Sequence, residues 1–172
     1  MRPARLERPG DSVTVVAALV TRSGCWIGAD SLSSDNQTCS VVDTPKVGWF
    51  GDKLIGYAGS WDGQRVLEIA ARNPELTYAE ILFRAGTLDS DINLLCVENG
   101  RIIFSQSNKE MLVRSRRFGV SYDAIGSGAP QALGALYVNH AGEHSLRLAL
   151  RAAAEHNPFV RAPFRVVGGP WR

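Results

Sequence analysis

The stretch Thr14-Val15-Val16-Ala17-Ala18-Leu19-Val20 decides the fold. Every residue after the threonine is apolar, so a strand formed here presents apolar side chains on both of its faces and must be covered on both sides. The run 92–97 has a similar character, whereas the segments with helical spacing have one apolar and one polar face. We therefore predict an α+β protein in which two sheets pack against each other and helices cover their outer faces, a four-layer αββα sandwich.

Short turns connect several of the expected strands, for example at Ser23-Gly24 and at Gly51-Asp52. Turns this short join neighbouring antiparallel strands, so both sheets should be mainly antiparallel. The expected strands cover residues 14–21, 25–30, 39–42, 46–50, 53–58, 91–97, 101–106, 110–115, 121–125 and 164–167, with a polar loop over 31–38. The expected helices cover about residues 60–72, 77–84, 129–137 and 143–155. The second helix is marked most clearly, because Thr77-Tyr78-Ala79-Glu80 is a capping box and Gly86 supplies the stop.

The length of 172 residues fits one domain with a substantial core. Residues 1–13 hold three Arg, two Pro and a Gly without any period, so we treat them as a leader, a propeptide or a mis-assigned start, and place the domain at 14–172. The 19 basic and 17 acidic residues leave a net charge of only +2, which argues against a nucleic-acid surface. No apolar run reaches the roughly 18 residues that a membrane span needs. We expect a cytoplasmic protein that binds neither nucleic acid nor membrane.

The three cysteines, Cys25, Cys39 and Cys96, are an odd number without a CxxC spacing. This pattern favours reduced thiols over disulfides and offers no metal framework. We expect neither a metal nor another cofactor.

Thr14, Asp30 and Lys46 follow one another at intervals of sixteen residues. A threonine that becomes the first residue of a chain carries its hydroxyl beside a free α-amine, so nucleophile and base share one residue. The amine titrates near ~7.7–8.0 and is partly unprotonated at neutral pH. Taken singly, these residues are better explained by structure, Thr14 as a β-branched strand residue and Asp30 with Lys46 as an ordinary ion pair at strand ends; the family spacing described below reverses that preference.

The chain resembles a proteasome β-type subunit, or its bacterial relative, the peptidase subunit of the two-component ATP-dependent protease. Both are N-terminal-nucleophile hydrolases. The resemblance runs from Thr14 to about Val167, and each motif is short, so its strength lies in the joint order and spacing. The motifs are Thr14-Val15-Val16-Ala17-Ala18, Ile27-Gly28-Ala29-Asp30, Lys46 at the start of a strand, Gly56-Tyr57-Ala58-Gly59 and Ala124-Ile125-Gly126-Ser127-Gly128.

The resemblance implies a threonine-type endopeptidase with Thr14 as nucleophile. Lys46 would favour the alkoxide and lower the pKa of the amine, and Asp30 would pair with Lys46 and keep it charged and oriented. The backbone N–H of Gly59 would stabilise the oxyanion, and Ser127 would help to organise the amine and its water. Gly59 is also explained as a strand-to-helix turn residue, and Ser127 as a helix N-cap.

The resemblance further implies a polypeptide substrate, a homo-oligomeric ring that confines the activity, and an ATPase unfoldase as a possible partner. Two other functions stay open. The first is a non-catalytic assembly subunit with the same fold. The second is a small-molecule amidase of the wider superfamily.

The chain departs from the family at two places. Family members carry an aspartate, a serine and glycines between the last helix and the last strand, whereas Glu155-His156-Asn157-Pro158-Phe159-Val160-Arg161 has neither aspartate nor serine, so Glu155 or Asn157 would have to substitute. Proteasome precursors usually have glycine before the threonine, and Val13 stands here. One route to a free Thr14 is autocatalytic removal of residues 1–13. Our preferred hypothesis is that Val13 reflects a GUG start codon, so that the product begins Met-Thr and the methionine is trimmed.

Overall fold

The computed structural model describes residues 14–34, 39–41, 44–60, 62–86, 92–106, 109–112, 116–117 and 119–171. These residues form two five-stranded sheets with the strand orders β10-β11-β1-β2-β12 and β5-β6-β7-β8-β9, and a separate two-stranded pair, β3-β4. The strands are β1 (Val16–Val20), β2 (Gly24–Ala29), β3 (Leu32–Ser34), β4 (Cys39–Val41), β5 (Val47–Phe50), β6 (Lys53–Gly59), β7 (Ile92–Glu98), β8 (Arg101–Gln106), β9 (Lys109–Leu112), β10 (Arg116–Arg117), β11 (Val120–Ile125) and β12 (Arg165–Pro170). All pairings between them are antiparallel, as predicted.

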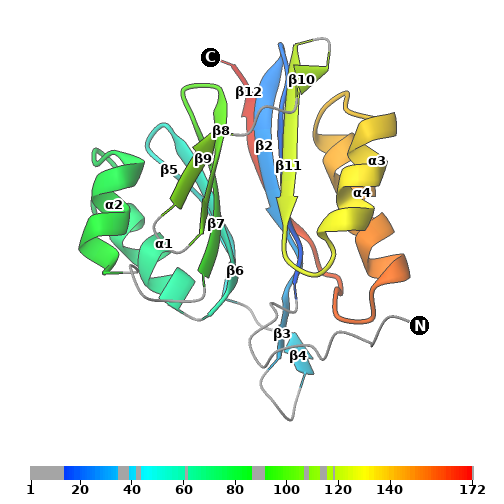
Figure 1. Ribbon diagram of the computed structural model, residues 1–172, viewed down its shortest axis with the longest axis horizontal. Coiled ribbons are helices and arrows are strands. Elements are labelled where there is room, and N and C mark those ends of the chain that lie inside the picture. Colours follow the sequence, from blue (N-terminus) through cyan, green and yellow to red (C-terminus); the bar gives the residue numbers. More distant parts are fainter. Residues whose placement is uncertain are drawn as a thin grey trace.

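Figure 1 shows four layers, with the two sheets face to face between two pairs of helices. One pair is α1 (Asp62–Arg72) with α2 (Tyr78–Ala85), and the other is α3 (Ala129–Val138) with α4 (Glu143–His156). Buried side chains fall into three clusters, one between each sheet and its helices and one between the sheets. The predicted four-layer αββα sandwich is therefore confirmed.

Strand β1 shows why the opening stretch decides this arrangement. Its even-numbered residues, Val16, Ala18 and Val20, belong to the core between the sheets. Its neighbours Ala17 and Leu19 belong to the core under α3 and α4. Because both faces of the strand are buried, the side chains on each face are all apolar.

The predicted loop 31–38 is wrong in its first half. Residues Leu32–Ser34 form β3, which pairs with β4. Strand β3 is only three residues long and two of them are serines, so it lacks the apolar alternation by which a strand is recognised. Strand β4 lies within the strand predicted over 39–42. The last strand is also longer than predicted, because it continues through Gly168 and Gly169 to Pro170.

Helix α2 forms where its caps predict. The Thr77 side chain accepts from the Glu80 N–H at 3.3 Å, and the Glu80 carboxylate accepts from the Thr77 N–H at 2.8 Å. Gly86 ends the helix in the left-handed conformation, with φ +63°. This local pattern needs no tertiary contact to be recognised.

Several predictions concern residues that lie outside the described part of the chain. These are the leader 1–13, residues 35–38 of the expected loop, residues 42, 91 and 113–115 of expected strands, and residue 61 of the first expected helix. Within the described residues, no helix is long and apolar enough to cross a membrane. The described residues also hold no cluster of three His, Cys, Asp or Glu side chains suited to a metal. Cys25 and Cys96 are free thiols.

Candidate active site

Thr14 lies two residues before β1, next to the turn between β11 and α3. Its residue is 3% exposed. The Asp30 N–H donates to the carbonyl of Val15 at 3.3 Å, which extends the β1–β2 pairing by one step beyond the strands. The sheet itself therefore brings Asp30 beside Thr14.

Lys46 reaches this point from the other sheet, because it directly precedes β5. Its Nζ donates to Thr14 Oγ1 at 2.6 Å, to Asp30 Oδ1 at 3.1 Å and to the Leu32 carbonyl. All three ammonium hydrogens thus have acceptors. The three residues predicted from their spacing converge in one buried hydrogen-bonded group.

The Asp30 carboxylate is held from several sides. It accepts from the Thr14 hydroxyl, from the Val15 N–H at 3.2 Å and from the Leu32 N–H at 3.2 Å, in addition to Lys46. A carboxylate that accepts from this many donors is held in one orientation. The Thr14 hydroxyl, in turn, donates to Asp30 and accepts from Lys46.

Burial lowers the pKa of the Lys46 ammonium below its usual value of 10.5. The negative charge of Asp30 and the hydrogen bond to it act in the opposite direction. The lysine is therefore a cation whose charge depends on its aspartate partner. A buried cation 2.6 Å from a hydroxyl oxygen stabilises negative charge that develops on that oxygen.

The turn between β11 and α3 holds the main chain of Thr14. The Gly128 N–H donates to the Thr14 carbonyl at 3.2 Å, and Ser127 Oγ donates to the same oxygen at 3.4 Å. Gly126 has φ +90°, and a Cβ at this position would overlap that carbonyl oxygen. The N-cap of α3 is Gly128 rather than Ser127, so the Ser127 hydroxyl faces the threonine instead of capping the helix.

Gly59 ends β6 at the same end of the molecule. The Tyr57 N–H donates to the Lys46 carbonyl at 3.0 Å, and Gly59 lies two residues further along the strand. Gly59 is exposed and has φ +108°. None of the described contacts joins it to Thr14, so it borders the group without being part of it.

The two residues considered as replacements for the family aspartate lie elsewhere. Glu155 is exposed. The side-chain oxygen of Asn157 accepts from the Phe159 N–H at 2.9 Å, within its own turn. Among the described contacts, neither side chain reaches Thr14.

Sequence reasoning missed three members of the group, namely the Leu32 carbonyl and the glycines Gly126 and Gly128. The carbonyl carries no side-chain signal, because any residue supplies a backbone acceptor. The two glycines stand in a quoted motif, Ala124-Ile125-Gly126-Ser127-Gly128, and a glycine pair around a serine at the end of a strand is a signal for close approach of main chain.

The fold is shared with several solved structures. BPH from Thiobacillus denitrificans, in complex with epoxomicin, superposes with a TM-score of 0.71 and 21% identity over 91% of this chain and 98% of that chain. HslV from Trypanosoma brucei gives a TM-score of 0.69 and 15% identity over 90% and 98%. Anbu, an ancestral beta-subunit from Yersinia bercovieri, gives a TM-score of 0.70 and 16% identity over 91% and 81%.

No protein-family model matches the sequence, and no curated protein does either. The likenesses in structure, all below 25% identity, show a common fold over nearly the whole chain. The resemblance and the fold class predicted from the sequence are thereby confirmed as statements about fold.

Proposed function

We propose that this chain, which has the proteasome-type N-terminal-nucleophile hydrolase fold, is a threonine-type peptidase with Thr14 as its nucleophile. One observation carries the proposal, the contact of the Thr14 hydroxyl with both the Lys46 ammonium at 2.6 Å and the Asp30 carboxylate. A buried lysine beside a hydroxyl is the arrangement that activates a weak nucleophile. An ordinary ion pair at strand ends would not require a threonine hydroxyl in contact with both of its partners.

In the proposed mechanism, Thr14 is the first residue of the mature chain. Its α-amine takes the hydroxyl proton, directly or through a water, as the oxygen attacks the carbonyl carbon of the peptide bond. The Gly59 N–H holds the oxyanion, and the protonated amine gives its proton to the leaving nitrogen. A water then attacks the resulting ester, which releases the second product and restores the hydroxyl. Lys46 stays protonated throughout and stabilises the alkoxide, and Asp30 keeps Lys46 in place.

The first test is the intact mass of the protein made from its own gene, which should begin at Thr14. This protein should hydrolyse unstructured peptides and gain the mass of one inhibitor per chain on incubation with epoxomicin, the compound in the BPH structure. A Thr14→Ala variant should lose the adduct and at least about a thousandfold in kcat/KM. Thr77→Ala, the same substitution in the exposed cap of α2, serves as the matched control and should keep both. A retained Val13–Thr14 peptide bond in active protein would exclude Thr14 as the nucleophile.

We also propose that the chain assembles into a homo-oligomeric ring. Helix α3 contains no charged residue, and its last turn exposes Tyr137 and Val138 at 56% and 81%. Apolar side chains this exposed favour a protein contact. Native mass spectrometry at micromolar concentration should give a single closed oligomer, and a monomer under these conditions would contradict the proposal.

A non-catalytic assembly subunit is the second candidate, and one observation favours it. The segment after α4, residues 157–164, contains no acidic residue, and the side chain of Asn157 binds within its own turn. If the protein with a free Thr14 forms no epoxomicin adduct and cleaves neither peptides nor acylated amino acids, this candidate replaces the peptidase.

A further inference from the structure

Arg165 opens β12 at the end of the sheet where Thr14 lies. It pairs with Ala29 of β2, and Ala29 pairs with Val16 of β1, so the three residues stand in one row across the sheet. Strands lie about 4.8 Å apart and rise about 3.4 Å per residue, and Thr14 is two residues beyond Val16, so the Cα atoms of Arg165 and Thr14 are about 12 Å apart. An extended peptide covers that distance in about three to four residues, and fewer once the arginine side chain is extended.

The side chains of Arg165 and Thr14 lie on the same face of this sheet. Paired residues of antiparallel strands point to the same side. Val16 and Ala29 belong to the core between the two sheets, and the Thr14 side chain meets Lys46 from the opposite sheet. Arg165 therefore lies on the face of this sheet that meets the other sheet. Because β12 is an edge strand, the Arg165 side chain is nevertheless exposed.

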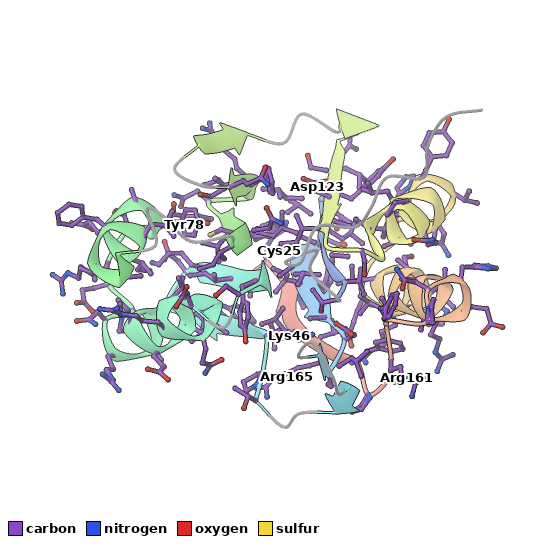
Figure 2. All side chains as sticks on the ribbon, turned by 60° about the horizontal axis from the view of Figure 1, so that its bottom comes forward. Cys25, Lys46, Tyr78, Asp123, Arg161 and Arg165 are labelled. Atoms are coloured by element: carbon purple, nitrogen blue, oxygen red, sulfur yellow. The ribbon has the colours of Figure 1, made fainter. Side chains whose placement is uncertain are left out.

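Strand β5 of the other sheet lies across from β12, and Lys46 directly precedes β5. A Cβ on Gly169 would lie 3.9 Å from the Trp49 ring, so these two positions face each other across the sandwich. Both strands run away from the Thr14 end. Four residues before Gly169 in β12 is Arg165, and four residues before Trp49 is Pro45, so Arg165 lies opposite Pro45, the neighbour of Lys46. Figure 2, turned to bring this end forward, shows Arg165 close to Lys46, with Arg161 further along toward α4.

The connection that carries Arg161 and leads to Arg165 is fixed against the site. The Ser31 N–H donates to the Arg161 carbonyl at 3.3 Å, and Ser31 Oγ donates to the Pro163 carbonyl at 2.7 Å. Ser31 directly follows Asp30. Both arginines are exposed, and in the described part of the chain no carboxylate forms an ion pair with either of them.

The charges around Thr14 do not balance within the described residues. Asp30 is neutralised by Lys46 at 3.1 Å, which leaves the two arginines as uncompensated cations beside the site. A region of surface that carries one sign of charge attracts ligands of the opposite sign. We propose that Arg165, assisted by Arg161, binds a carboxylate of the peptide substrate, which makes the site selective for acidic peptides. The planar guanidinium suits this role, because it binds a carboxylate through two parallel hydrogen bonds.

The inference rests on the proposed peptidase function, so its test has a hydrolysis arm and a binding arm. The protein made from its own gene is given matched peptides with Glu or Gln one to three residues from the cleaved bond, each with a free or an amidated C-terminus. The Thr14→Ala variant is titrated with the same peptides carrying a fluorophore. Arg165→Gln and the double variant with Arg161→Gln are compared with Arg101→Gln, an exposed arginine at the opposite end of the sandwich.

A carboxylate site gives about a tenfold preference in kcat/KM and in binding, the scale of a partly exposed charge-assisted contact. Arg165→Gln should reduce this preference to less than twofold, while Arg101→Gln keeps it. A preference for Glu identifies an acidic side chain, and a preference for the free C-terminus identifies the terminal carboxylate. An equal affinity for all peptides, or a preference that survives Arg165→Gln, overturns the inference. If nothing is cleaved and the binding preference persists, the peptidase proposal fails and the carboxylate site stands.

Discussion

Replacing Lys46 by Met tests the buried ion pair without asking for any catalytic activity. Methionine keeps most of the side-chain volume and removes the charge. The Lys46 and Asp30 side chains are 8% and 0% exposed, so the substitution leaves a carboxylate in the interior without its cation. Removing one partner of a buried pair costs about 3–5 kcal/mol.

The structure allows this range to be narrowed. In the variant, Asp30 keeps its three other donors, the Thr14 hydroxyl and the N–H groups of Val15 and Leu32. These bonds offset part of the lost attraction, so we expect a loss at the lower end, about 3 kcal/mol. With an m-value of about 2 kcal/mol per molar urea, the midpoint of unfolding should fall by about 1.5 M.

Urea unfolding followed by circular dichroism at one fixed protein concentration measures this loss, because assembly would otherwise shift the midpoint. The cycle is completed with Asp30→Asn and the double variant, in which no charge is left. The double variant should be at least about 2 kcal/mol more stable than the sum of the two single losses predicts. Additive losses, or a loss below about 1 kcal/mol for Lys46→Met, would refute a coupled buried pair.

Three further outcomes are expected. Because burial lowers the pKa of Lys46, its ammonium should lose its proton, and the peptidase its activity, as the pH rises through a value below 10.5. In Lys46→Arg, whose cation persists, the alkaline limb of the kcat/KM profile should move to higher pH, even if the maximum of the profile is lower. A limb that stays in place would assign it to another group. Gly126→Ala should destabilise the protein by about 2 kcal/mol or more in thermal unfolding, because Gly126 has φ +90° and a Cβ there would overlap the Thr14 carbonyl. The control Gly134→Ala, within α3 and with no atom within 4 Å of the added Cβ, should stabilise it by about 0.5–1 kcal/mol. Equal effects of the two substitutions would show that the close approach at Gly126 does not affect stability. Thr77→Ala should cost about 1 kcal/mol of unfolding free energy through the lost cap, with activity intact, and a variant as stable as the parent would mean that the capping box contributes nothing.

The fold could be predicted where its causes are local. The apolar run from Val15 to Val20 demands cover on both faces, and the capping box at Thr77 starts a helix by itself. Strand β4 lies within the strand predicted over 39–42, whereas β3 could not be predicted, since one apolar residue followed by two serines shows no period.

The candidate site divides in the same way. Spacing and resemblance select Thr14, Asp30 and Lys46, and all three meet in the fold. The sequence could not reveal that the third acceptor of the lysine is the backbone of Leu32, or that Gly126 leaves room for the Thr14 carbonyl. Both features depend on which segments of main chain approach each other, and that is decided by the packing of the two sheets.

Every described partner of Thr14 lies later in the chain than the threonine itself. Its hydroxyl meets Asp30 and Lys46, and its carbonyl is held by Ser127 and Gly128. The described residues therefore supply partners for both the hydroxyl and the carbonyl of Thr14. In the proposed peptidase, cutting one covalent link would add a free amine to a residue whose hydroxyl these contacts already hold.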